Sequence, residues 1–204
     1  MYAASRTPLG LIAGSTLFDV VSHRQATWLL RVAAVTAATA ATALAAQVSI
    51  PFQPVPFTLQ PMVVLLTAAA LGSRLGASAQ VLYLLLGVAG LPVFAASPFL
   101  APGLGRLLGP TGGFLLAYPA AAFVTGLLAE RRFDRRYATS LVAMLTGLAI
   151  VYVGGIAGVA LAPPSPGLAA ALTVAGPFLV ADLLKLVLAA GVLPSLWRLL
   201  ARTS

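Results

Sequence analysis

Two ionisable residues, Asp182 and Lys185, interrupt an apolar stretch near the end of the chain. Three positions apart, they share one face of a helix and can pair. Each charge costs about 2.5–3.5 kcal/mol at the centre of a membrane helix. An ammonium can hold a carboxylate, and an aspartate accepts hydrogen bonds from N–H groups. The pair therefore predicts either a buried salt bridge or a site for a small ligand that carries an acid and N–H donors.

The other residues give little support to enzyme chemistry. The chain has no cysteine and one histidine, His23, which lies in a polar N-terminal segment. A histidine triad or an H-E-x-x-H metal site is therefore excluded. The remaining acids, Asp19, Glu130 and Asp134, belong to charged segments that we expect at the cytoplasmic surface. We expect a protein that is not an enzyme and needs no metal or cofactor.

The single lysine also excludes the phosphate-binding loop G-x-x-x-x-G-K-[ST], because the residue before it is Leu184. Every other cation is an arginine. The arginines are explained by the preference of basic residues for one side of the membrane, but that preference does not explain a lysine within an apolar run. Active transport by this chain would need a partner ATPase or an ion gradient.

The composition is that of an integral membrane protein. Of the 204 residues, 60% are hydrophobic and 8% are charged, whereas about 25% are charged in ordinary soluble domains. The net charge is +8, but the arginines stand at the ends of apolar runs. We interpret them as topology signals and expect no nucleic acid partner.

The apolar runs predict an all-α protein with six transmembrane helices, since about 20 residues cross a membrane. The expected helices are residues 28–46, 62–72, 75–95, 110–129, 138–161 and 168–192. Ten arginines would then lie on the side of both termini and only Arg106 on the other, which predicts cytoplasmic termini. The expected domains are a cytoplasmic tail at 1–27, a membrane domain at 28–200 and a short tail at 201–204, in a bacterial plasma membrane.

Two irregular, largely apolar loops are expected on the outer face, at 49–61 and 96–112, together with the break at 162–167. The first has prolines at 51, 54, 56 and 61, which exclude a helix interior. Irregular backbone within a membrane must be buried in protein or line a cavity. Counted from residue 168, Asp182 lies ~21 Å and Lys185 ~26 Å along the last helix. The pair should therefore lie near mid-depth, beneath these loops.

Four motifs follow one another along the chain. They are IPFQPVPFTLQ at 50–60, YLLLGVAGLPVF at 83–94, LGPTGG at 108–113 and DLLK at 182–185. Together they resemble the BioY family, the biotin-specific substrate-binding subunits of energy-coupling factor (ECF) transporters. The resemblance covers about residues 28–200 and implies a six-helix bundle that captures biotin from outside, in a pocket closed by the two loops. It also implies that Asp182 and Lys185 contact the ligand.

Biotin has one carboxylate and a ureido ring with two N–H donors, and charge favours Lys185 for the carboxylate and Asp182 for the ureido group. Arg106 is expected either to attract the carboxylate or to anchor the chain at the interface. The stretch with Gly109, Thr111 and Gly112 is expected to contact ligand through its backbone or to pack a helix start. The aromatic candidates for stacking on the thiophane ring, with bundle packing as the alternative, are Phe57, Tyr83 and Tyr118.

Small residues recur every four positions in the first helix, at Ala33, Ala37, Ala41 and Ala45. This spacing lets another helix approach closely, from the same bundle or from a partner. In the BioY family such a stripe docks the membrane coupling subunit, which carries two ATPase subunits, and the first three alanines match it. Some members occur without those partners, so a solitary homo-oligomer remains an alternative.

Two other functions are open. The chain could be a stand-alone secondary transporter for a small organic acid, with the Asp182 and Lys185 pair coupling proton movement. It could also have a purely structural or assembly role. Internal repeats of the kind common in secondary transporters are not visible, which disfavours the first of these.

Overall fold

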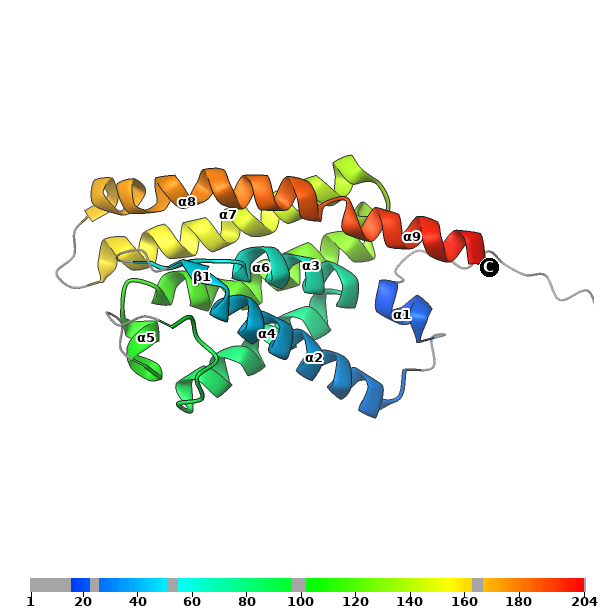
Figure 1. Ribbon diagram of the computed structural model, residues 1–204, viewed down its shortest axis with the longest axis horizontal. Helices are drawn as coiled ribbons and strands as arrows, with labels where there is room; N and C mark the ends of the chain where they lie inside the picture. The colour runs from blue at the N-terminus through cyan, green and yellow to red at the C-terminus, as the bar shows by residue number, and fades with distance from the viewer. Residues whose placement is uncertain (1–15, 23–25, 51–54, 97–101, 163–166, 204) are drawn as a thin grey trace, which may run out of the picture.

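The computed structural model describes residues 16–22, 26–50, 55–96, 102–162 and 167–203. The long helices run roughly along one axis, with a β-hairpin and α5 at one end and α1 and α9 at the other (Figure 1). In chain order, the elements are α1 (Leu17–Val21), α2 (Trp28–Gln47), β1 (Ser49–Ile50), β2 (Phe57–Thr58), α3 (Gln60–Leu71), α4 (Ser73–Val88), α5 (Leu104–Leu108), α6 (Gly112–Glu130), the 3-10 turn η1 (Phe133–Arg135), α7 (Tyr137–Leu161), α8 (Gly167–Ala189) and α9 (Val192–Thr203).

Four helical stretches of the described chain are long and apolar enough to cross a membrane: α2, α6, α7 and Gly167–Arg202, which joins α8 and α9. The apolar helices α3 and α4 have 12 and 16 residues, roughly 18 and 24 Å at 1.5 Å per residue. A helix therefore stands at each of the six expected places. The protein is a multi-pass helical membrane protein, and six full crossings stay an expectation.

Small residues hold α6 close to its neighbours. A Cβ on Gly113 of α6 would strike the backbone of Gly154 and Gly158 on α7. On the opposite side, a Cβ on Gly126 would strike Gly72, at the turn between α3 and α4. Gly72 has a φ of +88°, which favours glycine. Backbones can approach this closely only where side chains are absent, and α6 therefore lies at the centre of the bundle.

The first loop is more ordered than expected. Within the predicted irregular stretch 49–61, β1 pairs antiparallel with β2, Ser49 opposite Thr58 and Ile50 opposite Phe57. The expectation was wrong for these residues, whose β-branched and aromatic side chains favour strands. Residues 51–54 lie outside the described ranges. Helix α3 begins at Gln60, two residues early, because a proline in the first turn is compatible with a helix.

The second loop also departs from expectation. Helix α4 ends at Val88, seven residues before the predicted end, because Gly90 adopts a φ of +93° and Pro92 follows. A short helix, α5, forms where only irregular chain was predicted. Helix α6 begins at Gly112, so that Pro110 lies in the preceding turn and does not open the helix.

The C-terminal region is two helices. The predicted helix over 168–192 ends as α8 at Ala189, and α9 then continues to Thr203. Gly191 and Pro194 lie at the junction, where both residues weaken a continuous helix. Helix α9 takes in residues 201–203, which the sequence assigns to a tail.

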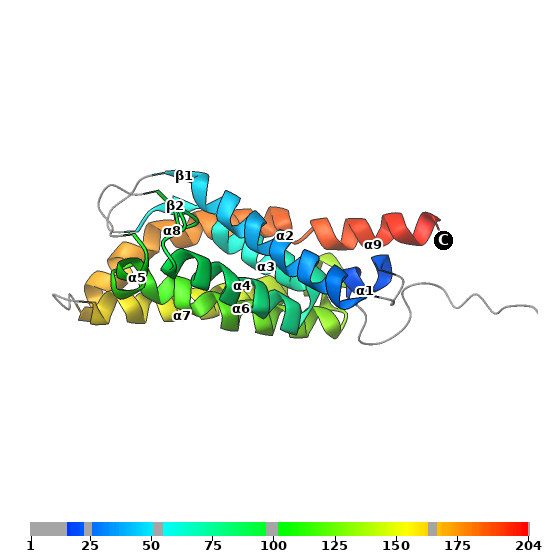
Figure 2. The same ribbon diagram turned by 90° about the horizontal axis from the view of Figure 1, so that it is seen from below.

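Part of the N-terminal segment is folded onto the bundle. Thr16 caps α1, accepting from the Asp19 amide at 3.2 Å while its own amide donates to the Asp19 carboxylate at 3.0 Å. Val20 is buried, and α1 packs against α3. Figure 2 shows α1 at the same end of the bundle as α9. His23 lies outside the described residues.

Candidate ligand-binding site

A cavity of about 580 Å³, counted to its open mouth, lies beneath the hairpin and α5. Its walls come from the hairpin region, α3, the chain after α4, α5, α6, α7 and α8. The lining residues are Val55, Pro56, Phe57, Thr58, Gln60, Pro61, Phe94, Ala95, Arg106, Thr111, Phe114, Leu115, Tyr118, Tyr152, Phe178 and Asp182. The wall is thus mostly apolar, with a few polar groups and one acid and one base.

Both carboxylate oxygens of Asp182, which lines this cavity, accept a hydrogen bond from the protein. Its Oδ1 accepts from Lys185 Nζ at 2.9 Å, as the spacing of three residues predicts. Its Oδ2 accepts from the Tyr152 hydroxyl at 2.8 Å. The Asp182 side chain is 8% exposed and that of Lys185 is 14% exposed. A second oxygen lone pair on each carboxylate oxygen remains available to an N–H donor in the cavity.

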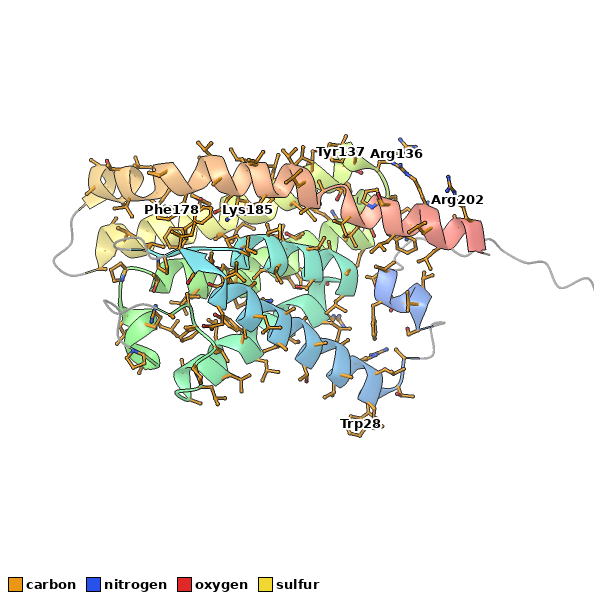
Figure 3. The ribbon with its side chains drawn as sticks, in the orientation of Figure 1. Trp28, Arg136, Tyr137, Phe178, Lys185 and Arg202 are labelled. Atoms are coloured by element: carbon orange, nitrogen blue, oxygen red, sulfur yellow. The ribbon has the colours of Figure 1, made fainter. Side chains whose placement is uncertain are left out.

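Lys185 holds the hairpin as well as the acid. Its Nζ donates to the Thr58 carbonyl at 2.8 Å and lies 3.6 Å from the centre of the Phe57 ring. The Phe57 ring is stacked 6.1 Å from that of Phe178 on α8. Lys185 is not among the residues that line the cavity in the described chain. Lys185 therefore ties α8 to β2 through the Thr58 carbonyl. Figure 3 shows Lys185 and Phe178 on the side of α8 that faces the rest of the bundle.

Arg106 is the basic residue that lines the cavity. It lies on α5 and is only 6% exposed, which does not suit an interfacial anchor. Thr111, in the turn before α6, also lines the cavity, and its hydroxyl donates to the Arg106 carbonyl at 3.3 Å. The turn between α5 and α6 thus brings a guanidinium and a hydroxyl to the same cavity.

The other glycine and aromatic candidates divide into two groups. Phe57 and Tyr118 line the cavity, and their ring contacts with a ligand stay a prediction. Gly109 and Gly112 are not among the lining residues, and a Cβ on Gly112 would strike the backbone of Leu107. For Gly112 the structure therefore favours the packing alternative, because α5 and α6 meet there.

Tyr83 lies behind the wall. It is fully buried, accepts from Gln60 Nε2 at 2.7 Å and donates to the Val93 carbonyl at 3.1 Å. Its ring meets the edge of Phe94 at a centroid distance of 5.4 Å. Gln47 of α2 donates to the carbonyls on either side of Val93, at 3.2 Å each. These bonds position Gln60 and Phe94 on the cavity, so Tyr83 supports the site without lining it.

Sequence reasoning missed Tyr152, Phe178 and Gln60. Tyr152 is the only tyrosine within the expected helix 138–161, and a tyrosine hydroxyl inside a membrane helix needs a partner. That signal was available. Gln60 stands in a quoted motif, but nothing in its spacing tells that it bonds Tyr83 at a separation of 23 residues.

The alanine stripe of α2 is partly open. Ala33 and Ala37 are exposed, Ala41 is half-buried and Ala45 is 6% exposed. The C-terminal half of α2 thus packs in the bundle, against α3 and α4, while the N-terminal half leaves its small residues accessible.

Three comparisons with known proteins agree. The family profile described as BioY family matches residues 17–202. The biotin transporter BioY of Thermotoga maritima is 44% identical over 118 residues, covering 58% of this chain and 67% of that protein. The biotin transporter BioY of Rhodobacter capsulatus is 41% identical over 143 residues, covering 65% and 74%.

A solved structure shares the fold. It is the crystal structure of the S-component for biotin from an ECF-type ABC transporter, with a TM-score of 0.71 at 23% identity. The superposition covers 83% of this chain and 92% of that one. Because the family profile spans nearly the whole described bundle, this chain belongs to the BioY family.

Proposed function

We propose that this protein is a membrane subunit that binds biotin from outside the cell and mediates its uptake. The observation that carries the proposal is a mostly apolar cavity with Asp182 and Arg106 among its lining residues. Biotin matches this lining, because it has an apolar body, a carboxylate and a ureido group with two N–H donors. Its relatives are named biotin transporters, which supports the same function.

The lining also suggests how biotin is oriented. Arg106 is the cation that lines the cavity, and a guanidinium suits a carboxylate. Asp182 and its partner Tyr152 offer oxygens to the ureido N–H groups. Lys185, which we expected at the carboxylate, is engaged with Asp182 and the Thr58 carbonyl. We therefore assign the biotin carboxylate to Arg106. Lys185 would position Asp182 and the hairpin.

Aromatic residues would enclose the thiophane ring. Phe57, Phe178 and Tyr118 lie on the hairpin, α8 and α6, and all line the cavity. Burial of an apolar ring contributes roughly 25 cal/mol per Å² of surface removed from water. Closing the hairpin over such a ring would link ligand affinity to the contacts that Lys185 makes with β2.

The topology in this proposal has six crossings, with both termini in the cytoplasm of a bacterial cell. Arg31, Arg74, Arg131 and Arg136 are all exposed and lie at the ends of helices that point toward α1 and α9. An excess of arginine marks the cytoplasmic side. The hairpin and α5 would then face outward, where biotin arrives.

Energy would come from a partner. The proposed partners are an ECF transmembrane coupling subunit and two ATPase subunits, with a solitary homo-oligomer as the alternative. The exposed Ala33 and Ala37, with Ala41 below them, offer a face of small residues for a docking helix. The absence of a phosphate-binding loop from the sequence supports dependence on such partners.

Equilibrium binding of labelled biotin to the purified protein in detergent tests this function. We expect saturable binding that Asp182→Asn and Arg106→Gln weaken strongly. Arg74→Gln is the matched control, since Arg74 is exposed on α4 at its far end from the cavity. A well-folded parent protein that binds no biotin would contradict the proposal. Uptake by liposomes that follows a pH gradient without any ATPase would favour the secondary transporter.

A further inference from the structure

A row of exposed apolar residues runs from α8 into α9. Its members, three or four positions apart, are Leu184, Leu188, Val192, Leu196 and Leu199, exposed by 64%, 72%, 40%, 38% and 57%. Leu184 and Leu188 share one face of α8, and Val192, Leu196 and Leu199 share one face of α9, because residues three or four apart lie on the same side of a helix. On a spanning helix, such a face contacts lipid. Because the row continues to Leu199, lipid contact extends along α9.

Arginines stand where this row ends. Arg198 and Arg202 of α9 and Arg136, at the start of α7, are exposed. The Tyr137 hydroxyl donates to the Val187 carbonyl at 2.8 Å, which holds the start of α7 against α8. In Figure 3, Arg136 and Arg202 both project from the bundle at the end where α9 lies. Arg198 and Arg202 are four residues apart and so share one side of α9.

Aromatic residues indicate how deep these arginines lie in the membrane. Tyr137 is 42% exposed and Trp28 is 70% exposed, and both residue types gather at the edge of the hydrocarbon region. Figure 3 shows Arg136 and Arg202 farther along the long axis than these two aromatic side chains. Residues just beyond this aromatic level reach the headgroup region of a bilayer, where the lipid phosphates lie. We therefore place Arg136 and Arg202 at that level.

The acids near this end are engaged by other groups. The Glu130 carboxylate accepts from the Ser73 amide and hydroxyl at 2.7 and 2.8 Å. Asp134 accepts from Trp197 and Arg135. Trp197 of α9 is buried, and Arg198 next to it is exposed.

We propose that Arg136, Arg198 and Arg202 bind the phosphate of an anionic phospholipid, whose acyl chains lie along the row from Leu184 to Leu199. Guanidinium groups bind phosphate through paired hydrogen bonds. A lipid fits better than a soluble phosphate or an acidic protein, because the row leading to the arginines is apolar and continuous with the lipid-facing side of α8. The site is separate from the biotin cavity and does not depend on its ligand.

A lipid titration in detergent tests this site, with the unfolding midpoint as the measurement. The probes are phosphatidylglycerol, phosphatidylcholine and glycerol 3-phosphate, which has the anionic headgroup chemistry without acyl chains. Two double variants are compared. The α9 double variant carries Arg198→Gln and Arg202→Gln. The matched pair, Arg31→Gln and Arg74→Gln, is the control and removes the same charge from exposed sites on α2 and α4. Arg136→Gln is a single variant for the case in which the double variant does not fold.

We expect phosphatidylglycerol to stabilise the parent protein at lower concentration than phosphatidylcholine. The α9 double variant should weaken its apparent affinity by ~10- to 30-fold, because each arginine in direct contact with the anionic headgroup contributes a factor of about five. The matched pair should change it less than about threefold. Equal losses in both double variants, no preference between the two lipids, or full competition by glycerol 3-phosphate would each contradict the site.

Discussion

Two buried aspartates of this protein are bonded in nearly the same way. One carboxylate oxygen of Asp182 accepts a hydrogen bond from Lys185 Nζ at 2.9 Å, and the other accepts one from the Tyr152 hydroxyl at 2.8 Å. One carboxylate oxygen of Asp134 accepts from Arg135 Nε at 3.2 Å, and the other accepts from the Trp197 indole N–H at 2.6 Å. In each cluster the cation also lies over an aromatic ring, at 3.6 Å from the Phe57 centre and 3.3 Å from the Trp197 centre.

The two clusters differ in what surrounds the carboxylate. Asp182 lines a cavity, and its cation holds a hairpin of only two residues per strand. Asp134 is 1% exposed, and its donors tie η1 to α9. An aspartate, a cation and an aromatic donor therefore do not by themselves make a binding site. Asp182 lines a cavity and is therefore open to a ligand, whereas Asp134 is enclosed between η1 and α9.

The largest expected effect separates the clusters by ligand affinity. Asp182→Asn replaces a carboxylate, which accepts hydrogen bonds on both oxygens, by an amide with only one accepting oxygen. We expect biotin affinity to fall about 100-fold, since a hydrogen bond to a charged group contributes ~1.5–3 kcal/mol. Equilibrium binding in detergent measures this. Asp134→Asn is the matched change, and an equal loss of affinity in both variants would contradict the distinction.

The second prediction concerns stability. Trp197→Phe removes the N–H donor from Asp134 Oδ2 and leaves a buried carboxylate oxygen without that partner. We expect the free energy of unfolding to fall by about 1–3 kcal/mol, measured by denaturant unfolding in detergent. Biotin affinity of the folded fraction should stay within about twofold. A large loss of affinity with unchanged stability would show that this cluster acts on the ligand.

A smaller effect is expected from Tyr152, which donates to Asp182 as Trp197 donates to Asp134. Tyr152→Phe removes the hydroxyl that fixes Asp182 Oδ2 but keeps the ring, which packs edge to face on Phe114 at 5.9 Å. We expect biotin to bind about three- to tenfold more weakly, because one hydrogen bond contributes ~0.5–1.5 kcal/mol. Tyr137→Phe, which removes an exposed hydroxyl on the same helix, should leave affinity unchanged.

The smallest effect is a dependence of stability on pH. Burial raises the pKa of the Asp134 carboxyl above its ordinary value, although the Trp197 donor and Arg135 oppose the rise. The folded state therefore binds this proton more tightly than the unfolded state. Between the two pKa values, stability falls as pH rises. Asp134→Asn should remove that part of the slope, measured by unfolding from about pH 4 to pH 7; an unchanged slope would contradict this origin.

The two clusters also show what could be predicted from the sequence. Asp182 and Lys185 are three residues apart, so a local rule predicts their pairing. Asp134 was expected at the surface, within a charged segment, but its partner Trp197 is 63 residues away. Long-range partners depend on how helices pack, and no local spacing contains that information.

The same limit applies to the cavity. The helices follow from the lengths of the apolar runs. A helix lies at each of the six expected places, and four helical stretches of the described chain are long enough to cross a membrane. Lys185 bonds the Thr58 carbonyl of β2, which lies 127 residues away in the sequence. Its role therefore depends on how the hairpin packs against α8. The breaks at Gly90 and Gly191 had sequence signals, but the hairpin and α5 lie in loops whose geometry is set by the walls they contact.

The most direct test of the account pairs a change in the protein with a change in the ligand. Biotin and biotinamide, which lacks the negative charge, are titrated against the parent protein and Arg106→Gln. If Arg106 holds the carboxylate, the parent protein should prefer biotin by at least about tenfold, and the variant should bind both ligands equally. An undiminished preference for biotin in the variant would contradict the assignment and favour Lys185 as the residue that binds the biotin carboxylate.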